Sequence, residues 1–349
     1  MGYRFYASYI STKIYSLQDF TGDVPAKEFQ DGIDFVPTKK EILFGHHFTS
    51  IAGAAPIIGP CIAAFWGWLP AMLWIVFGTI FMGAVHDFGA LVVSVREKGK
   101  TIADITGTII NKRVKTMFLI FVMMLSWLVL AVFAMAIAGL FVSIPTAVLP
   151  VNIEIIIALA VGFLLYRKKM DALIPSIIAL ILLYVFVYIG SFTPLSFDAI
   201  GMDKASQSTL WIILLFIYSG IASLLPVWFL LQPRDYINSH QLIVGLALIF
   251  MGIAIAQPVV EAPMIRSAGE GVPSLFPLLF VTIACGAISG FHGLVASGTT
   301  SKQVSNIQDT KMIGYGSMLG EGTLALASTI AAVAGISLVT NCNLPSIGL

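Results

Sequence analysis

The feature that most limits how this chain can fold is a long stretch, residues 42–85, that contains no Asp, Glu, Lys or Arg. The stretch begins with the paired histidines His46 and His47 and continues through a Gly- and Pro-rich segment, residues 53–60. It is apolar enough to cross a bilayer, yet glycine and proline interrupt an ordinary helix. Backbone groups freed in this way are tolerated at membrane depth only where they face protein or a water-filled cavity. We therefore interpret the segment as a broken transmembrane helix beside a binding site.

Composition places the rest of the chain in the membrane class as well. Hydrophobic residues make up 58% of the sequence and charged residues 11%, against roughly 25% charged residues in soluble domains. Several further charge-free runs are long enough for helices of about 20 residues and too continuous for the alternating strands of a barrel. The sequence thus predicts an all-α polytopic membrane protein with about nine transmembrane helices. The predicted spans are about 48–66, 70–95, 116–142, 152–166, 172–192, 208–231, 241–257, 273–300 and 315–340.

The distribution of positive charge predicts the orientation of these spans. If the N-terminus is cytoplasmic, all of the 19 Lys and Arg residues except Lys204 and Arg266 fall on the cytoplasmic side, as the positive-inside rule requires. We expect a multi-pass membrane protein with a cytoplasmic N-terminal segment, residues 1–41, that holds an interfacial helix, followed by a transmembrane domain, residues 42–349. Topology accounts for the basic residues, so the expected partners are membrane lipids and a small-molecule substrate, and not nucleic acid.

A short sequence pattern that occurs twice in the chain predicts how the spans are arranged. Residues 50–56 and 220–226 share the pattern Ile-Ala-x-x-x-Pro, in predicted spans one and six, which run in opposite directions. This favours a LeuT-like inverted repeat, with repeat one at about 48–192 and an incomplete repeat two at about 208–340 that lacks a tenth helix. Such transporters bind substrate near the midplane, between broken helices. The candidate substrate-binding residues at the two breaks are Ser50, Gly53, Pro56, Gly220, Ser223 and Pro226.

The first two spans carry ionisable groups that are costly in a bilayer. His46 and His47 lie at the cytoplasmic mouth of span one, where they fit a gate or proton relay, although capping the helix start would explain them equally well. His86 and Asp87 lie in span two, and an unpaired Asp there costs on the order of 2.5–3.5 kcal/mol. We expect Asp87 to be a proton-linked carboxylate, with a structural ion pair to Arg96 as the alternative.

The later spans add further polar candidates. His292 is a candidate for proton coupling or gating. It is followed by a hydroxyl-rich segment that includes the candidate substrate-binding residues Ser297 and Thr299, whose side chains suit a polar path. Glu321, in span nine, is a second candidate for proton coupling.

Three more ionisable side chains have weaker claims to a role in transport. Arg234 and Asp235, at the predicted end of span six, are expected to anchor a gate. Glu154, near the outer end of span four, is expected to reach water.

A metal- or haem-binding redox protein is the competing class. His46, His47, His86 and Asp87 are chemically suitable ligands for zinc or iron, but they match no HExxH or comparable spacing. We therefore expect neither catalytic residues nor a metal-binding site. The only cofactor expected is a coupling ion, either a proton or sodium.

Several motifs together resemble the carbon starvation protein A (CstA) family. They are FVPT at 35–38, FGHHF to GP at 44–60, GAVHDF at 83–88, LQPRDY at 231–236, GAISGFH at 286–292 and SGTTSKQ at 297–303. The resemblance implies an inner-membrane secondary transporter of the amino acid, polyamine and organocation (APC) superfamily, not an enzyme. It further implies uptake of peptides or proton-coupled uptake of pyruvate during nutrient limitation. Compared with typical family members, the chain is expected to be truncated at both ends.

Overall fold

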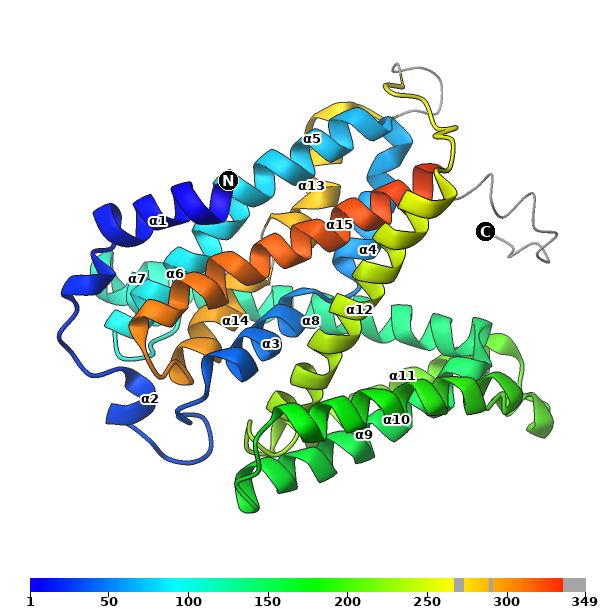
Figure 1. The fold of residues 1–349 in the computed structure, drawn as a ribbon, viewed down its shortest axis with the longest axis horizontal. Helices are drawn as coiled ribbons and strands as arrows, with labels where there is room; N and C mark the ends of the chain where they lie inside the picture. The colour runs from blue at the N-terminus through cyan, green and yellow to red at the C-terminus, as the bar shows by residue number, and fades with distance from the viewer. Residues whose placement is uncertain (267–272, 289–290, 335–349) are drawn as a thin grey trace. The chain divides into compact units, whose positions relative to one another are not determined.

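A computed structural model describes residues 1–266, 273–288 and 291–334 of the chain (Figure 1). Within these residues the structure is helical, apart from turns, loops and an isolated parallel bridge between Thr38 and Val304. The chain divides into two compact units. The first comprises residues 1–28, 37–100 and 239–349, and the second comprises residues 29–36 and 101–238.

The first unit is built around helices that meet closely along their lengths. Helix α4 packs against both α13 and α15, while α6 packs against α14 (Figure 1). Its helices are η1 Gly2–Tyr6, α1 Ala7–Tyr9, η2 Ile10–Ile14, η3 Leu17–Asp19, α2 Pro25–Glu28, α3 Lys40–Ile51, α4 Ala55–Ala63, η4 Ala64–Trp66, α5 Trp68–Gly78, η5 Thr79–Gly83, α6 Ala84–Arg96, α13 Leu275–Ala287, α14 His292–Gly298, η9 Thr300–Lys302, η10 Ile307–Asp309, η11 Lys311–Gly316 and α15 Ser317–Ala334.

The predicted N-terminal helix is present at Gly2–Ile14, where η1, α1 and η2 follow one another without a break. Ala7 and Ile10 are buried in the same hydrophobic cluster as Phe88 and Tyr315. The N-terminal helix is therefore an integral part of the first unit.

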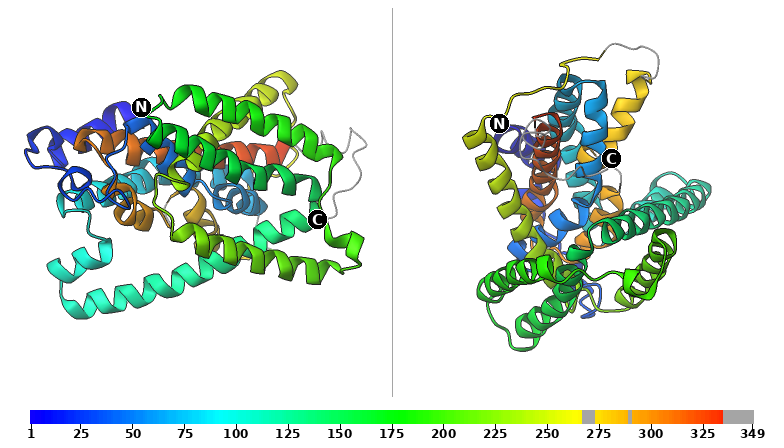
Figure 2. Two further views of the ribbon diagram at one scale, coloured as in Figure 1. Left: turned by 90° about the horizontal axis from the view of Figure 1, so that it is seen from below. Right: turned by 90° about the vertical axis from the view of Figure 1, so that its right-hand side faces the viewer.

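In the second unit, α8 lies along α11 and α9 lies along α10 (Figure 2). Asp203 caps the start of α11. The hydroxyl of Ser206, together with the backbone N–H groups of Ala205 and Ser206, lowers the pKa of Asp203 below its usual range. The helices of this unit are α7 Ile102–Ile109, α8 Lys112–Ser143, η6 Pro145–Ala147, α9 Val148–Gly162, η7 Phe163–Arg167, α10 Leu173–Phe192, η8 Phe197–Ile200 and α11 Lys204–Ser223, and α12 Leu231–Ala256 begins in this unit and ends in the first.

The described residues contain eight helices that are long and apolar enough to cross a membrane, or nine spans if the bent pair Lys40–Ile51 and Ala55–Trp66 counts as one. Each corresponds along the chain to a predicted span, so the multi-pass helical class is confirmed. The end of the ninth predicted span, beyond Ala334, lies outside the described residues, as do residues 289–290 of the eighth. The inverted repeat stays a prediction.

The break predicted in the first span is confirmed. Helix α3 ends at Ile51, α4 begins at Ala55, and the two helices are bent by 45°. Ala52 leaves the helical region with φ −81° and ψ 55°. Pro56 occupies the second position of α4, where a backbone N–H would have no partner within the helix. The interruption thus follows directly from the sequence.

The prediction for the second Ile-Ala-x-x-x-Pro segment is wrong in its placement. Helix α11 ends at Ser223, and Pro226 lies in the connection to α12, so the proline follows a helix end and does not interrupt a span. Span six ends before residue 231, because proline cannot continue the helix. Arg234 and Asp235 consequently lie in the first turns of α12 and not at the end of span six. Pro233 is at the third position of α12, within the first turn, where a backbone N–H would have no acceptor inside the helix.

A close approach between backbones joins α4 to α13. A Cβ atom on Gly286 would lie 2.4 Å from the backbone oxygen of Ala55, and one on Gly59 would lie 2.5 Å from that of Thr282. Contacts this short do not occur for real Cβ atoms. Because the atoms in the way belong to the backbone, an added side chain would force the two helices apart.

We therefore predict that Gly286→Ala destabilises the chain by about 1–3 kcal/mol, the usual cost of overpacking. The matched control is Gly252→Ala in α12, where a Cβ would meet nothing within 4 Å and where alanine favours the helix. Thermal unfolding in detergent should show a lower midpoint for Gly286→Ala and an equal or higher one for Gly252→Ala. Equal midpoints for the two variants would contradict the close contact.

Candidate functional site

Four ionisable side chains are buried together where α3, α6, α14 and α15 meet in the first unit. The exposed fractions are 0% for His47, Asp87 and Glu321 and 1% for His292. Each side chain comes from a different helix, and contacts between these helices hold the group together. The sequence predicted all four as proton-coupling or gating residues, and the structure brings them to one place.

His47 is held by hydrogen bonds at both ring nitrogens. Nε2 lies 2.8 Å from Oδ2 of Asp87, and Nδ1 lies 2.8 Å from the hydroxyl oxygen of Thr300, which is also fully buried. The carboxylate accepts from Nε2–H. Nδ1 then accepts from the Thr300 hydroxyl when the ring is neutral and donates to it when the ring is protonated. Thr300 can serve both states, so the imidazole can gain or lose a proton without losing a partner.

A second histidine–carboxylate pair lies beside the first. Nε2 of His292 is 3.2 Å from Oε2 of Glu321, and Glu321 lies within electrostatic range of both Asp87 and His47. Among the described residues, neither Glu321 oxygen makes a hydrogen bond of good geometry, and the same is true of Oδ1 of Asp87 and the Ser317 hydroxyl. Acceptor positions are thus left open between the two pairs.

The position of Glu321 on α15 depends on two small neighbours. A Cβ on Gly320 would lie 2.8 Å from the Phe48 ring, and one on Gly322 would lie 2.6 Å from the Thr79 side chain. These glycines allow α3 and η5 to approach the α15 backbone on either side of the acid. The sequence pattern Gly-Glu-Gly at 320–322 therefore has a direct packing role.

The two pairs suit a proton-carrying role because of how charge behaves in a site closed to water. An isolated buried carboxylate or imidazolium is strongly disfavoured, and a partner of opposite charge offsets much of that cost. A proton added to one pair changes the net charge of the whole cluster. The second pair is close enough for its electrostatic energy to change as well. Binding of a single proton can thus alter the interactions that hold four helices together.

The other two histidines predicted from the sequence are not members of the two buried pairs. His46 is buried on α3, while His86 is exposed on α6 and interacts electrostatically with Asp87 and His292. The alternative in which Arg96 pairs with Asp87 is wrong: Asp87 pairs with His47, and the guanidinium of Arg96 donates to the backbone oxygen of Tyr15.

Two of the predicted hydroxyl candidates stand apart from the buried pairs. Ser297 is buried, but its hydroxyl donates to the Gly293 oxygen at 2.7 Å, and Thr299 is only partly buried. The neighbouring Thr300 is the hydroxyl that contacts His47. The sequence identified the Ser/Thr segment but not this member, because the choice depends on helix rotation. Ser317 was likewise missed, although it lies four residues before Glu321 on the same face of α15.

The predicted substrate-binding residues divide between the two units. Ser50, Gly53 and Pro56 flank the break between α3 and α4 in the first unit, with Gly53 exposed. In the second unit, Ser223 donates a hydrogen bond to the Gly220 oxygen at 2.8 Å at the end of α11. Pro226 is the third substrate-binding candidate in this unit, which also holds Arg234 and Asp235, the residues predicted to anchor a gate.

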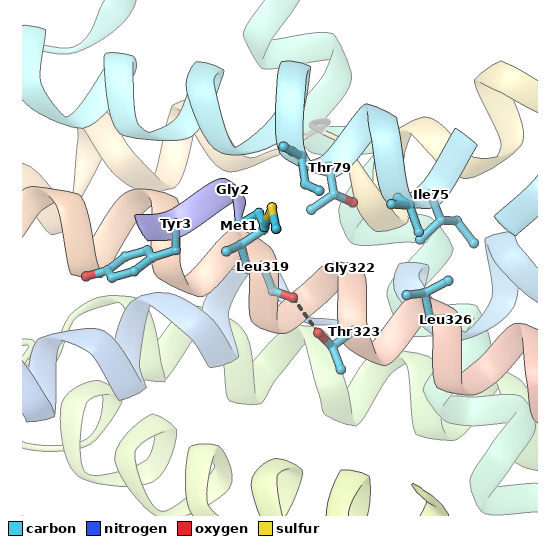
Figure 3. Close-up of a pocket in the computed structure, with 11 residues that line it drawn as sticks. Met1, Gly2, Tyr3, Ile75, Thr79, Leu319, Gly322, Thr323 and Leu326 are labelled. Carbon is cyan, nitrogen blue, oxygen red and sulfur yellow. Dashed lines mark hydrogen bonds between the residues drawn. The ribbon is translucent and has the colours of Figure 1, made fainter. Parts of the chain in front are cut away.

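A mostly apolar cavity of about 280 Å³ lies elsewhere in the first unit (Figure 3). It is enclosed by the start of the chain, the α5–η5 segment and one face of α15, and none of the four paired side chains lines it. The Thr323 hydroxyl at its edge donates to the Leu319 oxygen of its own helix (Figure 3). Among the described residues, no three His, Cys, Asp or Glu side chains are arranged to hold a metal ion.

Comparison with known proteins places this chain in a family. The family described as "Carbon starvation protein CstA" matches residues 1–346. The chain belongs to the CstA family. Its relatives include a protein from Campylobacter jejuni named "Peptide transporter CstA", 37% identical over 95% of this chain and 48% of the relative. Another, from Escherichia coli, is named "Pyruvate/proton symporter BtsT" and is 36% identical over 95% of this chain and 47% of the relative.

A second Escherichia coli relative, also named "Peptide transporter CstA", is 36% identical over 95% of this chain and 48% of its own length. The chain thus spans about half the length of the curated relatives it matches. No solved structure matches it. The CstA family assignment confirms the resemblance seen in the motifs, and these relatives are named as transporters, not enzymes.

The His47–Asp87 contact gives a measurable prediction. His47→Leu and Asp87→Leu should each destabilise the chain by about 3–5 kcal/mol, because each leaves one polar partner buried alone. The double variant should cost less than the two single changes combined by at least about 1 kcal/mol, since it removes both partners. Unfolding by sodium dodecyl sulfate in mixed micelles measures these free energies.

A control cycle combines Asp87→Leu with Thr329→Val. Thr329 is buried on α15, but its hydroxyl donates to the Ala325 oxygen of its own helix. These two changes should be additive. Additivity in the His47–Asp87 cycle as well would show that the two side chains do not depend on each other.

Proposed function

We propose that this CstA-family chain forms the proton-coupling part of a secondary transporter in the inner membrane, oriented with its N-terminus in the cytoplasm. The observation that carries the proposal is that two buried histidine–carboxylate pairs, His47–Asp87 and His292–Glu321, lie within electrostatic range of each other. Ionisable side chains within membrane spans are costly and characteristically line proton pathways in transporters. The relative named as a pyruvate/proton symporter supports a proton as the coupling ion.

The coupling rests on the different origins of the paired side chains. His47 is on α3, the first half of the broken span, whereas Asp87 is on α6. Protonation of Asp87 removes the negative charge that holds the Nε2–H of His47, and this weakens one connection between the broken span and its neighbour. A change in the α3–α4 break is then linked to proton binding, which is the minimum requirement of alternating access.

We propose that substrate binds at the break between α3 and α4, near Ser50, Gly53 and Pro56. The interruption leaves backbone carbonyl and N–H groups without helical partners, as in transporters built from discontinuous helices. Peptides and monocarboxylates such as pyruvate both remain substrates of this proposal, because the relatives are named for one or the other. The proposal includes the LeuT-like inverted repeat.

The central prediction concerns Asp87→Asn in proteoliposomes with an inward proton gradient. Asparagine keeps the size of the side chain but cannot cycle between charged and neutral forms. Accumulation of labelled pyruvate or labelled di- and tripeptides should fall to the level without a gradient, while exchange of the same substrate across the membrane continues. The wild-type chain should accumulate at least one of these substrates in a gradient-dependent way.

Glu97→Gln serves as the matched control, since it removes an acid whose side chain is 43% exposed outside the buried cluster. Its accumulation should equal that of the wild type. Gradient-driven accumulation by Asp87→Asn at the wild-type level would remove Asp87 from the coupling role. A wild-type chain that accumulates none of the substrates under a gradient would exclude proton symport by this chain.

A further inference from the structure

A second cavity, of about 290 Å³, lies wholly within the second unit and has a mixed polar and aromatic lining. It is enclosed by α8, α9, α11 and the start of α12. The residues that matter for its chemistry are Glu154, Tyr218, Arg234, Asn238, Phe141 and Trp211. Ligand sites commonly have volumes of roughly 300–1,000 Å³, so this cavity has the size expected for a small molecule.

Glu154 provides the principal charge of the cavity. The sequence led us to expect this side chain to reach water, but the structure buries its Oε1 atom, and that oxygen has no hydrogen-bond partner among the described residues. Asn238 donates a hydrogen bond to the carboxyl group. One oxygen is thus held in place while the other is left with an unmet capacity to accept. A buried acceptor in this state costs free energy unless a donor reaches it.

Arg234 does not neutralise Glu154, because it is already paired. Its Nε and Nη2 atoms both donate to Oδ1 of Asp235, at 3.1 and 2.9 Å, and Asp235 is only 2% exposed. Its Nη1 atom donates to the Tyr218 hydroxyl at 3.2 Å. Arg234 and Asp235 act on Glu154 with opposite sign. With Glu154 ionised, Glu154 and Asp235 together carry two negative charges against the one positive charge of Arg234, and the Arg234 guanidinium in the cavity lining already has Asp235 and Tyr218 as partners.

Aromatic rings form the wall on the α8 and α11 side. Phe141 and Trp211 meet edge to face, with ring centroids 5.0 Å apart, and Trp211 also contacts Phe197 at 5.2 Å. A cation close to such rings gains about 0.5–2 kcal/mol from their electron-rich faces. The rings also provide apolar surface for the hydrocarbon part of a ligand.

From this combination we propose that the second-unit cavity is a binding site for a small organic ammonium ion, whose N–H groups donate to Glu154 and whose apolar part packs on Phe141 and Trp211. The ammonium group has two sources, the free amino terminus of a short peptide or a simple amine. Pyruvate carries no such group, so this site distinguishes among the substrates left open above. Every residue of the site belongs to the second unit, whereas the two histidine–carboxylate pairs belong to the first.

The test is direct binding to the purified chain in detergent, measured by calorimetry without any proton gradient. The probes are L-alanyl-L-alanine, its N-acetyl derivative, butylamine and pyruvate. Alanylalanine should bind at least tenfold more tightly than its N-acetyl derivative or pyruvate. Butylamine tells the sources apart, because binding of butylamine alone would support the site and assign it to simple amines.

Glu154→Gln is the diagnostic variant, since glutamine keeps the shape and the hydrogen bond to Asn238 but loses the charge. It should weaken binding of the ammonium probes at least tenfold, and Glu154→Asp should recover part of that loss. Glu261→Gln, which removes an exposed acid of the first unit, is the matched control and should bind as the wild type does. Circular dichroism and gel filtration confirm that each variant is folded.

Two results would overturn the inference. One is that neither alanylalanine nor butylamine binds the wild-type chain. The other is that folded Glu154→Gln binds both with wild-type affinity. Because no gradient is applied, these results are separate from those of the Asp87 experiment: loss of proton coupling cannot imitate loss of an ammonium site.

Discussion

The hydrogen bond between His47 and Asp87 is the contact on which the first unit depends most. It joins two spans in surroundings where neither side chain could be left alone, and Thr300 secures the imidazole from the other side. The helices around it are consequently fixed in rotation, since each must present its paired ionisable side chain inward. His292 and Glu321 repeat the arrangement with two more helices. The hydrophobic exteriors of these helices set their depth in the bilayer, but the four buried polar groups set which faces meet.

Much of this could be read from the sequence because a bilayer imposes simple requirements. Long charge-free runs marked the spans, and the residues from Gly53 to Pro60 marked the break between α3 and α4. The four ionisable side chains were recognisable one at a time, since each is expensive in a membrane and needs a reason to be there.

The pairing of those side chains could not be read in the same way. Contacts between residues that are far apart in the sequence depend on how helices rotate and pack, which periodicity does not determine. For the same reason, the sequence could not show that Thr300, and not its neighbours Ser297 and Thr299, contacts His47. Pro226 was misplaced for a different reason: a proline within an apolar run fits a kinked span and a helix end equally well from composition alone. Here it follows the last residue of α11, and the helix stops.

The two glycines on either side of Glu321 have a mechanical consequence. Interlocked side chains resist sliding, because each must climb over its neighbour, whereas a stretch of bare backbone offers little such resistance. At Gly320 and Gly322, α15 has no side chain that Phe48 or Thr79 would have to pass. The buried acid therefore lies where α3 and η5 meet α15 without an interposed side chain, and this lowers the steric resistance to a lengthwise shift of α15 at this point.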